Sequence, residues 1–199
     1  MIMSTLVTTA LFMAPPPATY QEIREVAVHH CHTKHWYDVN IDVVDDLIEV
    51  EKRFFVNHPI PGELRGMLLA AACNESGYNT YAKGDWVRRK GRRIPMAKGV
   101  VQLHPWWAKK YKVDRYDHVQ SADAWMTHIV RQRHKIDKKN WCKRHSNLKK
   151  WIVAWVQTTR GRVNKENRYR CYQSPSHYRH LKRWHRFIEE YRKEFAIAD

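Results

Sequence analysis

Apolar residues recur at steps of three and four along most of this chain, and this period constrains the fold more than any other feature. Residues with that period lie on one face of an α-helix and must pack against other apolar surfaces. The expected helices cover residues 41–57, 62–75, 105–111, 121–136, 147–159 and 176–195. The stretch from Trp151 to Val156 is almost wholly apolar, which predicts a buried central helix. With no strong strand pattern and no internal repeat, the sequence predicts a mainly α protein.

Two segments fall outside the helical pattern. Residues 76–98 are basic and punctuated by glycine and proline, which indicates a turn-rich loop. Residues 15–40 have the composition of a second loop-rich segment, so we expect an N-terminal extension (1–40) before one domain (41–199). The first 14 residues resemble a short signal segment without its usual positive charges. Export by this segment and a frayed or packed apolar terminus both fit the sequence.

The charge of the chain narrows the choice of partners. Its 36 Lys and Arg residues exceed its 20 Asp and Glu residues, which gives a net charge of +16. Residues 61–199 alone carry 32 basic and 12 acidic side chains. Such a field attracts nucleic acid, anionic lipid or an acidic cell-wall polymer. Nine Trp and ten Tyr argue against a disordered basic tail, and no apolar run reaches the roughly 20 residues that span a bilayer.

Cysteine and histidine could indicate a metal site, but their spacing gives little support for one. Cys31, Cys73, Cys142 and Cys171 lie far apart and form no CxxC pair. One or two disulfides in an exported protein fit this pattern, and so do four reduced thiols. The segment HHCHTKH at 29–35 contains zinc-ligand types, yet a solvated polar stretch explains it better. We therefore expect no metal and no cofactor.

Glu75 is the first candidate for a catalytic residue. It ends a helical stripe formed by Leu64, Leu68 and Ala71, so its carboxyl should be partly desolvated. Desolvation penalises the ionised carboxylate, and a carboxylic acid that stays protonated can donate a proton to a glycosidic oxygen. A glutamate that caps the helix end or pairs with a nearby arginine fits the position equally well.

Four segments together resemble one enzyme family. They are LLAAACNESGYN (68–79), GVVQLHPWWAKKYKVDRYD (99–117), AWVQTTRGRV (154–163) and HYRHLKRW (177–184). In order and spacing they are similar to the ESG, GLMQ, AYNAG and closing Tyr motifs of soluble-type lytic transglycosylases. Goose-type lysozymes, in the same lysozyme-like superfamily, are relatives of that family. The resemblance covers 43–185 and implies a lysozyme-like helical domain with a catalytic cleft.

The resemblance also implies roles for individual residues. Glu75 would protonate the leaving glycosidic oxygen and then act as the base. Ser76 would hold the Glu75 side chain or a sugar substituent, and Tyr178 would lie near Glu75. The other implied substrate-binding residues are Tyr78, Val101, Gln102, Trp155 and Gln157. The asparagine of the third motif is missing, because Val156 or Gln157 stands there.

The number of acids bears on the reaction type. A hydrolytic glycosidase usually needs a second carboxylate about 5–9.5 Å from the first. Between Glu75 and Gln102 the chain offers only Asp85, which would also fit an exposed acid paired with Arg88 or Arg89. A single acid suits the transglycosylase route, in which the sugar's own 6-hydroxyl displaces the leaving group. Hydrolysis by a muramidase remains the alternative.

We therefore expect an enzyme that cleaves the β-1,4 bond between N-acetylmuramic acid and N-acetylglucosamine in peptidoglycan. It would act on the bacterial wall, in the periplasm or outside the cell, as a bacterial enzyme or a bacteriophage lysis or virion protein. An anionic wall polymer or membrane surface would be a second partner. Two rivals remain: a basic nucleic-acid-binding protein that interleaves Trp with Arg, and a wall-binding protein with a decayed site.

Overall fold

The computed structural model describes residues 16–35, 38–138, 144–159 and 176–196, and this part is mainly helical, as predicted. Its helices are α1 (Tyr20–His35), α2 (Ile41–Asn57), α3 (Met67–Ser76), α4 (Pro105–Tyr111), α5 (His118–Asp137), α6 (Asn147–Thr159) and α7 (Ser176–Ala196). A 3-10 turn (Gly62–Leu64) precedes α3, and strands β1 (Lys83–Arg89) and β2 (Arg92–Lys98) follow it. No helix in these residues is long and apolar enough to cross a bilayer.

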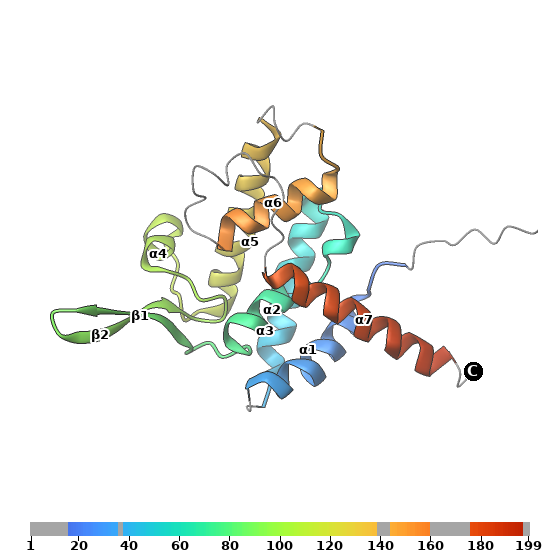
Figure 1. Ribbon diagram of the computed structural model, residues 1–199, viewed down its shortest axis with the longest axis horizontal. Coiled ribbons are helices and arrows are strands. Elements are labelled where there is room, and N and C mark those ends of the chain that lie inside the picture. Colours follow the sequence, from blue (N-terminus) through green and yellow to red (C-terminus); the bar gives the residue numbers. More distant parts are fainter. Residues whose placement is uncertain (1–15, 36–37, 139–143, 160–175, 197–199) are drawn as a thin grey trace, which may run out of the picture.

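Helix α3 is the most enclosed helix of the described chain. Every residue from Met67 to Cys73 is buried, and α1, α2 and α7 all pack against this helix (Figure 1). Its small Ala and medium Leu and Met side chains let neighbouring helices approach on all sides. Helix α6, which we expected to be central, packs on α5 instead, although Trp151, Ala154 and Trp155 are buried as predicted.

The N-terminal end of α3 is held by an acid from α2. The Glu51 carboxylate is fully buried and accepts hydrogen bonds from the Gly66 and Leu68 N–H groups, both at 2.8 Å. These are N–H groups that a helix start leaves without partners inside the helix. Burial raises the pKa of Glu51 to about 7, against the backbone hydrogen bonds that lower it.

Residues 20–35 form a helix, so the expectation of a loop there is wrong. Ile23, Ala27 and Cys31 recur at steps of four and are buried against the other helices. Thr19 and Glu22 start the helix with a reciprocal cap, in which each side chain accepts a hydrogen bond from the other's N–H. The histidine-rich second half hid this pattern in the sequence. The signal-like residues 1–14 lie outside the described part.

Residues 83–98 form an antiparallel hairpin, so the expected loop over 76–98 and the absence of strands are also wrong. Arg89 pairs with Arg92 across a two-residue turn of Lys90 and Gly91. Both turn residues have positive φ (48° and 78°), which matches the twist of a tight hairpin. Most of the hairpin's side chains are exposed, so the sequence lacks the apolar alternation of a half-buried strand.

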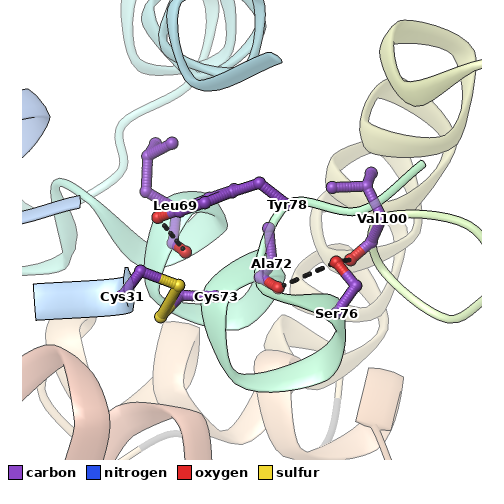
Figure 2. Close-up of a disulfide and its surroundings, with 7 residues drawn as sticks. All are labelled: Cys31, Leu69, Ala72, Cys73, Ser76, Tyr78 and Val100. Carbon is purple, nitrogen blue, oxygen red and sulfur yellow. Dashed lines mark hydrogen bonds between the residues drawn. A yellow bond between two sulfur atoms is a disulfide. The ribbon is translucent and has the colours of Figure 1, made fainter. Parts of the chain in front are cut away.

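A disulfide fastens α1 to α3. Cys31 and Cys73 are bonded, with their Cα atoms 5.7 Å apart, although they are 42 positions apart in the chain (Figure 2). This resolves one of the pairings that the sequence left open, whereas Cys142 and Cys171 lie outside the described residues.

His30, next to Cys31, stacks on Phe187 of α7. The described residues contain no group of three or more side chains placed to hold a metal ion.

Candidate active site

A cavity of about 620 Å³ opens beside the C-terminal end of α3. The base of the hairpin, the 101–104 segment and helices α4, α5 and α7 complete its walls. It brings together Glu75, Asp85 and Gln102, three residues predicted from the sequence. The lining residues are Ala71, Glu75, Gly84, Asp85, Ala97, Val101, Gln102, Leu103, His104, Trp106, Trp107, Trp125 and His177.

The end of α3 places Glu75 at the edge of this cavity. The helix stops at Gly77, whose φ of 63° is left-handed and whose N–H donates to the Cys73 carbonyl. Glu75 therefore lies in the last turn, below the apolar stripe that includes Ala71. Its side chain is 34% exposed, so it is open to the cavity and to solvent.

His177 of α7 holds the Glu75 carboxylate. Its Nε2 lies 2.8 Å from Glu75 Oε1, and its side chain is only 4% exposed. The Nδ1 atom is buried without a hydrogen-bond partner among the described residues. The Nε2 atom is placed to donate a hydrogen bond to the carboxylate oxygen. The sequence left a helix cap or a nearby arginine as the alternative explanation for Glu75; among the described residues its ion-pair partner is a histidine instead.

The resemblance implied that Tyr178 lies near Glu75, but the residue that contacts Glu75 is the preceding one, His177. Tyr178 is half-buried and meets the Trp155 ring edge-on at 6.5 Å, whereas His177 lies nearly parallel to that ring at 6.1 Å. The sequence contained a signal for the inward position of His177. His177, Leu181, Trp184 and Ile188 are spaced by four, three and four residues and all are buried, so His177 belongs to the inner face of α7.

Ser76 connects α3 to the turn at 99–102, and this corrects its expected role. Its hydroxyl lies within hydrogen-bond distance of the Val100 carbonyl (2.8 Å) and the Ala72 carbonyl (3.1 Å), as Figure 2 shows. Ser76 is buried and does not line the cavity. The residue therefore positions the turn rather than binding Glu75 or a sugar.

The same turn carries Gln102 into the cavity. Gly99 has a φ of 80°, and a side chain there would overlap the Arg115 carbonyl oxygen. The Gln102 N–H donates to the Gly99 carbonyl at 3.1 Å, and the Gln102 Nε2 donates to the same carbonyl at 2.8 Å. The Gln102 Oε1 packs against Gly84 at the base of the hairpin, where any Cβ would clash. Val101, also predicted, lines the cavity beside it.

Asp85 lies in the same cavity but pairs differently from the expectation. Its Oδ2 is 2.8 Å from His104 Nε2, and no ion pair of the described residues joins it to Arg88 or Arg89. Its side chain is 67% exposed. The cavity thus contains a second carboxylate, contributed by β1, in addition to Glu75.

Two predicted substrate-binding residues lie in the core instead. Tyr78 is 1% exposed, its hydroxyl donates to the Leu69 carbonyl at 3.0 Å, and burial raises its pKa well above the usual value. Trp155 is fully buried and meets Trp125 at 88°. Both side chains are too deep to contact a ligand in the cavity. Gln157 lies on α6, at a position whose side chain is outside the described part.

Tryptophans form the face of the cavity that our sequence analysis missed. Trp106 is 42% exposed, and its ring lies 4.7 Å from that of Trp107, with the Lys110 ammonium 5.6 Å away. Behind them His128 is buried, with its Nδ1 2.7 Å from the Tyr111 hydroxyl. Burial, and then the charge of Lys110, lowers the pKa of His128 to about 4, so the ring is neutral at pH 7.

Comparison with known protein families, with curated proteins and with solved structures found no match. A carboxyl group held by a buried histidine can transfer a proton to a bound ligand. The exposed indole of Trp106 and the Gln102 amide can bind a ring that carries both apolar and polar edges, as a sugar does.

Proposed function

We propose that this protein cleaves the β-1,4 bond between N-acetylmuramic acid and N-acetylglucosamine in peptidoglycan, as a lytic transglycosylase. One observation carries the proposal: Glu75 and Gln102, from separate motifs, line one cavity of about 620 Å³. The nucleic-acid alternative leaves the ESG and GVVQ segments without a role. The sugar-compatible face of Trp106 in the same cavity supports a glycan ligand.

In the proposed reaction Glu75 acts twice. Its carboxyl proton passes to the glycosidic oxygen as the bond from that oxygen to C1 of the muramic acid breaks. The 6-hydroxyl of the same sugar then bonds to C1 and gives its proton to the Glu75 carboxylate. The products are a free hydroxyl on the leaving sugar and a 1,6-anhydromuramyl end. This sequence is balanced without water, metal or cofactor.

The surroundings of Glu75 suit this role. A glycan in the cavity would exclude water from the exposed part of the side chain, and so remove solvent that stabilises the ionised form. His177 bonds to Oε1, and no hydrogen bond from a described residue reaches the other carboxylate oxygen, which can exchange the proton with the sugar. His177 is thus a positioning residue, because it acts through Glu75.

Hydrolysis by a muramidase is the second candidate, and Asp85 favours it. An acid on the hairpin that lines the cavity of Glu75 is a candidate for the base that activates a water molecule. Its bond to His104 would keep its carboxylate oriented. Asp85→Asn separates the two routes, because it should abolish the release of reducing ends and leave the release of anhydro ends intact.

The disulfide supports an action on the cell wall. Disulfides persist in oxidising surroundings such as the periplasm and the outside of the cell, and Cys31–Cys73 lies in the core beside the site. We propose that the protein works there, as a bacterial wall enzyme or as a bacteriophage lysis or virion protein.

The direct test is solubilisation of purified peptidoglycan sacculi by the full chain and by Glu75→Gln. We expect the variant to lose at least about a thousandfold in rate, since the proton donor is removed, while its unfolding temperature stays unchanged. Glu63→Gln is the matched control, because Glu63 is exposed and does not line the cavity. Equal activity of Glu75→Gln and the wild type would overturn the proposal. Inactive wild type with tight DNA binding would instead favour the nucleic-acid alternative.

A further inference from the structure

The β1–β2 hairpin extends away from the helices (Figure 1), and the residues around its turn are mostly basic. Five of the six residues from 88 to 93 are basic, and all six are exposed. We call residues 88–93 the arginine tip. Its basic residues are Arg88, Arg89, Lys90, Arg92 and Arg93.

The arginine tip places like charges directly opposite one another. Arg88 pairs with Arg93 and Arg89 with Arg92 across the two strands. Facing residues in an antiparallel pair are only about 4.5–5.5 Å apart at Cα, so like charges there destabilise the hairpin. None of the ion pairs within the described residues joins these arginines to a carboxylate.

In the free protein, no carboxylate of the described residues offsets the repulsion between these arginines. An isolated two-stranded hairpin is marginally stable at best, and the only acid on these strands, Asp85, is bonded to His104. A closely spaced series of anions would relieve the repulsion between the arginines. Guanidinium groups bind phosphate through two parallel hydrogen bonds, which favours phosphate as that anion.

We propose that the arginine tip binds a phosphodiester-linked polymer of the cell wall, next to the glycan in the cavity. This inference rests on the proposed function. Gly84, Asp85 and Ala97 at the base of the hairpin line the cavity, and strands of seven residues reach about 20 Å from there. A polymer attached to the glycan would therefore meet the tip while the glycan lies beside Glu75.

The hairpin is poorly suited to the other polyanions. Its exposed apolar residues, Trp86, Val87 and Ile94, lie between the tip and the base, so entry into a membrane tip-first would bury the cations deepest. Proteins that bind single-stranded nucleic acid stack bases on several aromatic rings. This hairpin has one, Trp86, and the Arg93 guanidinium lies over its ring at 5.5 Å. Wall peptides carry widely spaced carboxylates, which match a dense cluster of cations less well than one phosphate per repeat.

Binding to isolated walls tests the inference, before and after hydrofluoric acid has removed their phosphate polymers. All proteins carry Glu75→Gln, so that binding is measured without digestion. Arg88→Gln/Arg93→Gln should bind untreated walls at least about tenfold more weakly than its parent, and extracted walls equally well. Arg179→Gln/Arg183→Gln on α7 is the matched control with the same net charge, and should lose less than about threefold. Soluble poly(glycerol phosphate) should compete with untreated walls for the parent only.

Several results would overturn the inference. An equal loss in the α7 control would mean that the overall field binds the wall and the tip has no special role. Unchanged parent binding after acid extraction would assign the contact to peptide carboxylates. Stronger binding to DNA or to anionic phospholipid vesicles than to walls would assign another polyanion. The proposed function is tested separately. It fails if the protein with an intact Glu75 does not solubilise sacculi.

Discussion

His177 and Glu75 lie 102 positions apart in the sequence and are in contact in the structure. Among the described residues, no other ion pair involves Glu75. Removing the imidazole should release the carboxylate, because no other described side chain bonds to Glu75 Oε1. We predict that His177→Phe lowers the rate of sacculus solubilisation about 10–100-fold, in line with the loss of a hydrogen bond to a charged group. His177→Gln, whose amide can donate to the same oxygen, should recover most of that loss.

A structural role alone predicts something different for His177. If the ring merely filled space against Trp155, then His177→Phe would be the better replacement and His177→Gln the worse one. The order of the two rates, measured beside the unfolding temperature of each variant, therefore separates positioning from packing.

Glu51 makes stability depend on pH with an unusual sign. Its pKa is about 7 in the folded protein and near 4.5 when unfolded, so the folded state binds the proton more tightly. Its contribution is thus fully present below pH 4.5 and is lost as the pH rises through 7, by at most about 1.4 kcal/mol per pH unit. Compared with the wild type, Glu51→Gln should therefore gain stability as the pH rises from 4.5 to 7 in urea unfolding, whereas exposed Glu49→Gln should keep the wild-type profile.

The contribution of His128 to stability changes with pH in the opposite direction to that of Glu51, over much of the same pH range. Its pKa is depressed to about 4, so the unfolded chain takes up the proton first and stability is lost as the pH falls below about 6.5. The two slopes offset one another in the wild type. Glu51→Gln should consequently uncover a rise in stability from pH 4 to 6.5. A flat profile in that variant would contradict the assignment to His128.

At the scale of single residues, short motifs predicted which side chains meet at the cavity. Glu75, Val101 and Gln102 were predicted because each lies in a short segment with a characteristic order of residues. His177 and Trp106 were not predicted, because their roles depend on the packing of α7 and α4 around the cavity. Ser76, Tyr78 and Trp155 were assigned to a ligand, although core packing and backbone carbonyls account for them.

Among the glycines in turns, Gly99 has the least room for a side chain. Its positive φ and the nearby Arg115 carbonyl leave no room for a side chain, whereas Gly91 has a similar φ and open space around it. We predict that Gly99→Ala lowers the free energy of unfolding by roughly 3 kcal/mol or more, and Gly91→Ala by only about 1 kcal/mol. Thermal or urea unfolding measures both.

Activity should follow the same order, since Gly99 shapes the turn that carries Gln102. Gly99→Ala should slow sacculus solubilisation even at temperatures where it remains folded. Similar stability and activity in the two alanine variants would mean that the contact with Arg115 does not restrict the turn.

The disulfide joins two elements that the sequence analysis kept apart. In the loop-entropy account, a bond that closes 42 positions contributes about 4 kcal/mol. We predict that Cys31→Ser/Cys73→Ser lowers the unfolding temperature and raises amide exchange in α1 well above that in α5 and α6. Uniform exchange across the helices would show that α1 stays docked without the bond.

Helices with one clear apolar stripe were predicted at nearly their observed bounds, as α2, α6 and α7 show. The failures have a common cause. In α1 the histidines dilute the stripe, and in the hairpin both faces are exposed, so neither element shows the contrast between apolar and polar faces that periodicity detects. The tight turn of Lys90 and Gly91 was the remaining signal for the strands.

Across the whole molecule, the mainly α class and the meeting of two distant motifs at one cavity were accessible from sequence. The projection of the cationic hairpin beside that cavity was not, because charge counts do not reveal where the charges lie. The proposed activity requires that Glu75 transfer a proton to a glycan.

Mass analysis of the fragments released from purified sacculi tests that claim most directly. We predict soluble muropeptides that end in 1,6-anhydromuramic acid, each lighter by one water than the hydrolytic product, and none from Glu75→Gln. Sacculi that stay intact with the wild type, or fragments that Glu75→Gln releases equally well, would contradict it.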